Sequence, residues 1–307
     1  MNRVLTVFDE LASSWDEKHG YIEGVYEGES ERLLKCAASY VQDGMRVADL
    51  GCGTGKVTEH ILKLNKNVEV VAVDGSREMV EVASEKFYEF DNVHCINSDL
   101  EQFCDDEAFD IIFLAQVIHH LDNPRNAMGH ITKLLKPNGI IILMVIGEEH
   151  MCSVVPYNES NDVLGRFDKR KLLDLFTLDS QSYCRIFDDH FKMAFNDMDD
   201  FNNFMAAVSL TPKMNGYEIH KNENIFHDLA CDEGGSLLVG GHYYTLIYKK
   251  DSITYNMSTN FKETVINAYN EWSENYNSIV LDKLERRGYG YDDLADVIRL
   301  KKELEKE

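Results

Sequence analysis

The chain has 307 residues, a mass of 35.2 kDa, a hydrophobic fraction of 44% and a formal net charge of −23. Length and apolar content together allow a large buried core, as one elaborated α/β domain or as two domains, and exclude an intrinsically disordered protein. The acidic excess repels phosphate backbones and anionic lipid, so it disfavours general binding to nucleic acid or to a membrane surface.

The cysteines and the apolar runs indicate the compartment. Seven cysteines are scattered along the chain without a CxxC pair, which argues against a disulfide scaffold or a zinc ribbon. Segment 1–18 lacks the apolar stretch of a signal peptide, and the run 140–146 is far shorter than the ~20 residues of a membrane span. We therefore expect a cytoplasmic protein with reduced thiols.

The first 39 residues are predicted to form a helical lid. Apolar residues recur at helical spacing at Leu5, Phe8, Leu11 and Trp15, and a second apolar stripe follows over 33–41. The segment 19–30 between the two stripes is rich in Gly and Glu and is predicted to be a mobile connection.

From residue 45 to 147, short apolar runs alternate with helix-length segments. The predicted strands are 46–50, 68–73, 93–96, 109–115 and 139–145, and the predicted helices are 56–64, 76–87 and 124–135. Ser76 suits a helix N-cap and Pro124 a first helical position. This alternation predicts βαβ units in an α/β fold with a doubly wound, Rossmann-like parallel sheet.

The rest of the chain is less regular. Helices are predicted at 169–176 and 199–208, and 234–248 is predicted to be a β-hairpin or a pair of edge strands that completes the sheet. Aromatic residues at partly helical spacing are expected to pack in the core, and some of them could wall an acceptor pocket: Tyr183, Phe187, Phe191, Phe195, Phe201 and Phe204.

Residues 251–307 are predicted to be a helical extension. Tyr269-Asn270 and Tyr276-Asn277 lie seven residues apart, as Phe8-Asp9 and Trp15-Asp16 do. Two interpretations stay open. The extension packs on the sheet or joins subunits into a homo-oligomer, or it is the start of a truncated second module.

A glycine-rich turn carries the strongest chemical signal. Gly51, Gly53 and Gly55 follow a predicted strand and precede a helix, where bare backbone and free N–H groups can meet a ligand. The G-x-G-x-G spacing fits neither the dinucleotide fingerprint nor a phosphate loop. Asp49, just before the glycines, would repel a pyrophosphate and would suit a positively charged amine.

Two more acids follow the next two strands. Asp74 can accept both hydroxyls of a ribose. Asp99 can accept from the exocyclic amine of adenine, with Leu100 against the ring. A ligand that joins an amino acid through a sulfonium to adenosine meets all three demands.

Five segments in register resemble the class I S-adenosylmethionine-dependent methyltransferases of the methyltransferase domain 11/25 type: VADLGCGTGKVTEHIL, VEVVAVDGSREMVEVA, NSDLEQF, FDIIFLAQVIHHL and ITKLLKPNGIIIL. The resemblance covers roughly residues 40–147. It implies a seven-stranded, mostly parallel sheet of order 3-2-1-4-5-7-6 with the last strand antiparallel, and S-adenosylmethionine as cofactor. It also implies that Trp15 covers the cofactor. The cofactor-binding residues expected from the resemblance and the motifs are Trp15, Asp49, Gly51, Cys52, Gly53, Gly55, Asp74, Gly75, Met79, Ser98, Asp99, Leu100, Ala115 and Gln116.

His119 and His120 follow the fourth predicted strand, at the expected mouth of the site. His119 is a candidate general base, whereas His120 is interpreted as an ordinary turn residue. Adjacent histidines do not have metal-ligand spacing, so no metal is expected there.

These observations predict methyl transfer to a small-molecule acceptor by in-line displacement, with release of S-adenosylhomocysteine. A methyltransferase acting on protein or RNA and a non-catalytic cofactor-binding partner subunit are the alternatives. The expected organisation is a lid at 1–39, a methyltransferase domain at 40–250 with a substrate-facing insertion at 148–232, and the extension at 251–307.

Overall fold

The computed structural model describes residues 3–25, 29–154, 164–176, 182–209 and 236–250. All of them belong to the first of two compact units, which spans Met1–Ser252. The predicted extension at 251–307 and much of the predicted insertion therefore lie outside the described residues.

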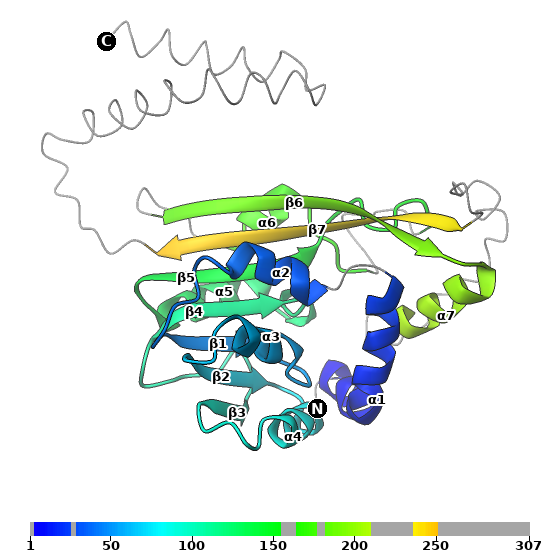
Figure 1. Ribbon diagram of the computed structural model, residues 1–307. Coiled ribbons are helices and arrows are strands. Elements are labelled where there is room, and N and C mark those ends of the chain that lie inside the picture. Colours follow the sequence, from blue (N-terminus) through cyan, green and yellow to red (C-terminus); the bar gives the residue numbers. More distant parts are fainter. Residues whose placement is uncertain (1–2, 26–28, 155–163, 177–181, 210–235, 251–307) are drawn as a thin grey trace, which may run out of the picture. The chain divides into compact units, whose positions relative to one another are not determined.

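The core is one seven-stranded sheet of order β3-β2-β1-β4-β5-β7-β6 (Figure 1). Its strands are β1 (Arg46–Leu50), β2 (Glu69–Asp74), β3 (Val93–Asn97), β4 (Phe109–Ala115), β5 (Leu135–Ile146), β6 (Ser182–Phe195) and β7 (Leu237–Lys250). Strands β1 to β5 pair in parallel, and β7 pairs antiparallel with both β5 and β6. The predicted strand order and antiparallel last strand are confirmed.

Helices cover both faces of the sheet. They are α1 (Arg3–Val25), α2 (Glu29–Ala37), α3 (Lys56–Leu64), α4 (Arg77–Lys86), α5 (Pro124–Ile131), α6 (Lys169–Leu173) and α7 (Met198–Ser209). Short 3₁₀ turns, η1 (Ile118–His120) and η2 (Thr132–Leu134), follow β4 and α5. None of these described helices is long and apolar enough to cross a membrane.

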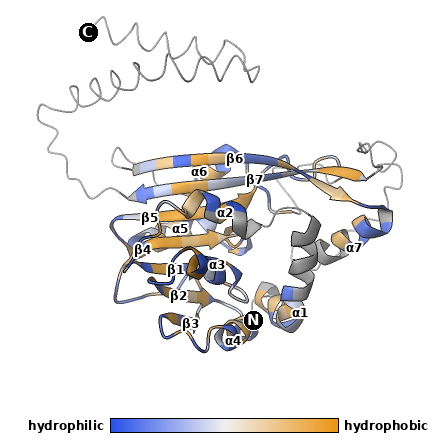
Figure 2. Ribbon diagram, in the orientation of Figure 1, coloured by the Kyte–Doolittle hydropathy of each residue, from blue (hydrophilic) through white to orange (hydrophobic). Residues whose placement is uncertain are grey.

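Two apolar clusters form, one on each face of the sheet, because successive strand residues point to opposite faces. Ile111 packs in the cluster of α2, α3 and α7, whereas its neighbour Ile112 packs in the cluster of α5 and α6. A strand buried on both faces is mostly apolar, which is why β4 and β5 are coloured as hydrophobic over most of their length (Figure 2).

Local signals place the helix starts. The Ser76 hydroxyl accepts from the Met79 N–H at 3.2 Å at the start of α4, and the Asn123 side chain caps α5 just before Pro124. The structure has α3 at the predicted bounds and α7 within one residue of them. In contrast, α6 ends at Leu173, earlier than predicted.

Two sequence predictions need correction, and one segment had no predicted element. The segment 19–30 was expected to be a mobile connection, but α1 continues to Val25. Residues 182–195, where the aromatic side chains showed partly helical spacing, form strand β6, because a spacing of four residues marks one face of a strand as well as one face of a helix. The hairpin or pair of edge strands predicted within 234–248 is wrong, since 237–250 is one continuous strand that lies between β5 and β6. Gly241 lies within this strand because a Cβ there would be 2.2 Å from the Phe191 ring, so the glycine leaves room for that side chain.

Candidate functional site

A cavity of about 310 Å³ lies at the carboxyl ends of the parallel strands. This is where ligands bind in open α/β sheets. The predicted site residues that line it are Trp15, Gly51, Cys52, Gly53, Asp74, Gly75, Met79, Asp99, Leu100, Ala115, Gln116 and His119.

The glycine loop between β1 and α3 forms the floor of the cavity. The N–H groups of Gly51 and Cys52 both donate to the Val73 carbonyl, at 2.7 and 3.0 Å, which ties the loop to β2. Gly51 has a φ of 79°, and a Cβ there would lie 2.3 Å from Val117. Gly53 has no atom within 4 Å of the place where its Cβ would stand, so a ligand can approach its backbone.

Asp74 lies at the end of β2 with both carboxylate oxygens engaged. Its Oδ2 accepts from the Gly53 N–H and its Oδ1 from the Ser76 N–H, each at 2.8 Å. Burial raises the pKa of this carboxyl group, while the two backbone bonds oppose the rise. Each oxygen keeps a second lone pair, so the carboxylate can still accept from ribose hydroxyls.

Three predicted cofactor residues stand behind the cavity wall and do not line it. Asp49 is 1% exposed and accepts from the Thr58 hydroxyl at 2.6 Å, and burial raises its pKa to about 6. Gly55 turns the chain into α3, and a Cβ there would lie 2.4 Å from the Phe87 ring. The Ser98 N–H donates to the Asp74 carbonyl at 3.0 Å. In this structure the three residues support the loop and do not form the surface offered to a ligand.

Helix α1 closes one side of the cavity. In its two aromatic-acid pairs, Phe8-Asp9 and Trp15-Asp16, the aromatic and the acidic residues make different contacts. Phe8 and Trp15 line the cavity, with their rings edge to face at 5.6 Å. Asp9 accepts from the Ser76 hydroxyl at 2.6 Å. Asp16 accepts from the Thr54 hydroxyl and pairs with Lys86 at 2.9 Å. The aromatic residues thus face the ligand space while the acids hold the helix against the glycine loop and α4.

We expect Asp16→Ala to loosen α1. The variant loses two charge-assisted bonds, so amide hydrogen exchange in α1 should become about five- to tenfold faster, the effect of roughly 1–1.4 kcal/mol. The matched control is Glu10→Ala, which removes an exposed acid from the same helix. Equal exchange rates in α1 for the two variants would show that Asp16 does not hold the helix.

The end of β4 supplies polar groups to the middle of the cavity. Gln116 has a φ of 56°, and both atoms of its side-chain amide are buried without a hydrogen-bond partner among the described residues. His119 is buried in the cavity wall, and its ring lies 4.0 Å from that of His120. His120 also lines the cavity and meets the Phe8 ring edge to face at 5.2 Å, so its interpretation as an ordinary turn residue missed a contact with α1.

The far wall of the cavity is mostly apolar and comes from segments distant in sequence. It consists of Ile146, His150, Met151, Leu164, Phe204 and Tyr243. The rings of His150 and Tyr243 stack at 5.4 Å. Of these six, only Phe204 belonged to the predicted pocket-wall candidates. The others carry no local signal, because strand pairing and loop packing bring them together.

The near half of the cavity is acidic. Asp74, Asp99, Glu101 and Asp122 line it, with Lys56 as the cationic side chain among the described lining residues. Such a lining favours a ligand with positive charge.

Comparison with known proteins agrees with this geometry. A family model described as a methyltransferase domain matches residues 48–141. The malonyl-[acyl-carrier protein] O-methyltransferase of Halalkalibacterium halodurans is 30% identical over 133 residues, 42% of this chain and 49% of that protein. The chain spans about half the length of the first curated relatives it matches.

Solved structures share the fold. The YcgJ protein of Bacillus subtilis has a TM-score of 0.52 at 18% identity, over 73% of this chain and 100% of its own. The [4+2]-cyclase SpnF has a TM-score of 0.50 at 16% identity, over 79% and 96%. A cyclase among these neighbours means that the fold alone does not name the reaction. The family match, the relatives and the sheet order together show that the chain carries a class I S-adenosylmethionine-dependent methyltransferase domain.

Proposed function

We propose that the protein transfers the methyl group of S-adenosylmethionine to a small-molecule acceptor and releases S-adenosylhomocysteine. One observation carries the proposal: a single cavity joins an acidic half at the glycine loop to an apolar, partly aromatic half. The first half suits a cationic nucleoside ligand, and the second suits the body of a small organic acceptor.

The residues present fit the cofactor. Open space at Gly53 admits a ligand to the backbone, and the Gln116 amide lies buried in the wall without a partner among the described residues. Asp74 and Asp99 would hold the ribose and the adenine, and Trp15 would cover the ligand. When bound, S-adenosylmethionine supplies a methyl group already activated by its sulfonium.

The protein itself then has to bind the acceptor, align it with the methyl group and shield the cavity from water. The cavity wall fixes the acceptor on the side away from the glycine loop, and alignment of two reactants supplies much of the rate. Helix α1 keeps water out of the cavity. His119, which lines the cavity, would take a proton from an acceptor hydroxyl. An oxygen acceptor is supported by the relatives, which are named as O-methyltransferases.

We place this activity in the cytoplasm and assign it to free metabolites. The six cysteines that the structure describes are free, which supports a reducing compartment. The net charge of −23 disfavours RNA as the acceptor.

Calorimetric titration with S-adenosylmethionine tests the cofactor assignment. We expect Asp74→Ala to weaken binding by about 10- to 100-fold, because the ribose contact and the support of the Gly53 N–H are lost together. Asp91→Ala, which removes an exposed acid before β3, should bind like the wild type. No binding by the wild type would overturn the proposal, and equal binding by Asp74→Ala would remove the ribose assignment.

Release of S-adenosylhomocysteine then identifies the acceptor class. We expect release with a pool of small metabolites and none with protein or RNA pools. Release only with protein or RNA would overturn the small-molecule assignment. Binding without release in any pool would favour a non-catalytic partner subunit.

A further inference from the structure

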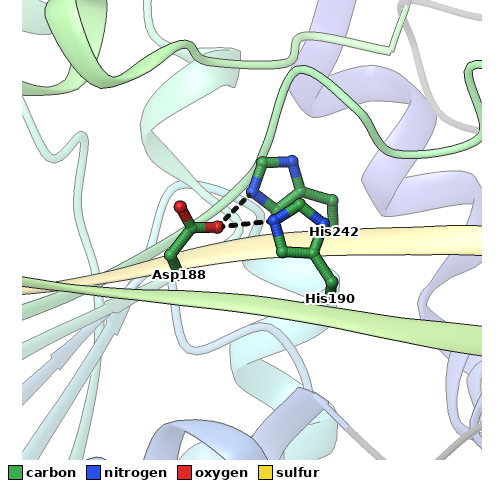
Figure 3. A group of neighbouring side chains, drawn as sticks. All are labelled: Asp188, His190 and His242. Carbon is green, nitrogen blue, oxygen red and sulfur yellow. Dashed lines mark hydrogen bonds and ion pairs between the residues drawn. The ribbon is translucent and has the colours of Figure 1, made fainter. Parts of the chain in front are cut away.

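A second group of ligating side chains lies on the β6–β7 ribbon (Figure 3). Asp188 and His190 are two residues apart on β6 and therefore project from one face. His242 on β7 stands directly opposite His190 in the antiparallel register. Its neighbour Tyr243 lines the cavity, so the side chain of His242 points to the other face of the sheet, away from the cavity.

The three side chains converge. The Nε2 atoms of His190 and His242 each lie 2.9 Å from Oδ1 of Asp188, and one ligand atom from each residue lies within 4.8 Å of the others. The two imidazole rings stack at 4.1 Å, with 13° between their planes. The two imidazoles thus contact the same carboxylate oxygen. The three ligand atoms are close enough together to bind a single ion.

The charge around the group is unbalanced. Glu149 Oε2 lies 3.6 Å from His190 Nδ1, and Glu148 accepts from the Tyr244 hydroxyl at 3.0 Å. The other oxygen of Glu148 is buried with no hydrogen-bond partner among the described residues. Lys169 pairs with Asp188 Oδ2 at 2.6 Å. Three carboxylates therefore face one ammonium group, so the carboxylates outnumber the lysine charge by two.

The hydrogen bonds of His242 show which of its ring nitrogens faces Asp188. Its Nδ1 accepts from the Glu149 N–H at 3.1 Å, which places the ring proton on Nε2, facing Asp188.

We propose that Asp188, His190 and His242 bind one divalent transition-metal ion of the zinc class. Two imidazole nitrogens and a carboxylate oxygen suit zinc and its neighbours, whereas magnesium prefers an all-oxygen shell. An ion at Nε2 of His242 moves that ring's proton to Nδ1. The bond from the Glu149 N–H then opens, so the segment 147–151 is expected to adjust when the ion binds.

Zinc titration of chelator-treated full-length protein tests the site. We expect the wild type to bind one Zn²⁺ per chain. Asp188→Asn and His190→Ala should each weaken binding at least tenfold. His94→Ala on β3 is the matched control, because the His94 and His190 side chains are similarly exposed, at 52% and 51%. Thermal melting verifies that each variant is folded; His242 is left unchanged because it is buried in the sheet.

Three results would overturn the site. The first is that the wild-type protein binds no Zn²⁺. Binding that survives both Asp188→Asn and His190→Ala belongs elsewhere, for example to cysteine thiols. Equal affinity of the wild type for Mg²⁺ and Zn²⁺ would contradict imidazole ligation. The titration needs no S-adenosylmethionine, so its failure would leave the proposed methyl transfer untouched.

Discussion

Gly51→Ala is expected to abolish S-adenosylmethionine binding in calorimetric titration, with an affinity loss of at least about 100-fold. At a φ of 79° an alanine adds strain of about 1–2 kcal/mol. The larger effect is steric, because the new methyl group would lie 2.3 Å from Val117 Cγ2. Val117 lines the cavity and follows Gln116, so relieving the clash moves the wall that the ligand needs.

Gly44→Ala separates strain from cavity geometry. Gly44 has a φ of 73°, nothing lies within 4 Å of its Cβ position, and it does not line the cavity. This variant should lose about 1–2 kcal/mol of unfolding free energy through the same backbone strain and keep wild-type affinity. If Gly51→Ala and Gly44→Ala bind S-adenosylmethionine equally well, the glycine loop is not the cofactor's cradle.

Asp49→Asn is expected to stabilise the folded protein at pH 7.5 by about 3 kcal/mol. The pKa of Asp49 rises from 3.8 to about 6 on folding, chiefly through burial. Below pH 4 the carboxyl group is protonated in both states. Between about pH 4 and 6 the unfolded chain gives up the proton while the folded protein keeps it, so stability falls by about 1.4 kcal/mol per pKa unit. Asparagine has nearly the same size and keeps an oxygen that can accept from the Thr58 hydroxyl. Because asparagine does not ionise, the variant avoids the fall in stability between about pH 4 and 6.

Urea unfolding at pH 4 and pH 7.5 measures the effect. The variant should match the wild type near pH 4 and exceed it at pH 7.5, whereas exposed Asp106→Asn should show no such difference. A wild type more stable than Asp49→Asn at pH 7.5 would contradict the prediction. The same variant tests the amine contact expected from the sequence. Because Asp49 stands behind the wall, we expect S-adenosylmethionine affinity within about threefold of the wild type.

The parallel half of the fold was predictable because its signals are local. Each strand from β1 to β5 is a short apolar run, and Ser76 and Pro124 mark helix starts in the sequence itself. The glycines and the acids at the strand ends were also predictable as site residues, since parallel strands bring their carboxyl ends to one edge of the sheet. The sequence could not show that Asp49 turns inward to Thr58 while Asp74 stays at the cavity.

The antiparallel half was harder to predict because its contacts join distant segments. His190 and His242 are neighbours through strand register alone, and no spacing rule links them. His150 and Tyr243 meet in the far wall for the same reason. The spacing of Phe187 and Phe191 fits a helix and a strand equally, so periodicity could not decide between them.

The position of β7 also bears on the order of assembly. Among the described strands, β7 is the last in sequence, yet it lies between β5 and β6, and β6 pairs with no other of them (Figure 1). Until residues 237–250 have left the ribosome, β5 therefore has an unpaired edge. During the same time β6 lacks the strand with which it pairs. Such late, long-range pairing slows folding and leaves strand edges open to other chains. The same strand brings Tyr243 to the cavity, so a nascent chain completes the far wall of the cavity and pairs the open edge of β5 in a single step.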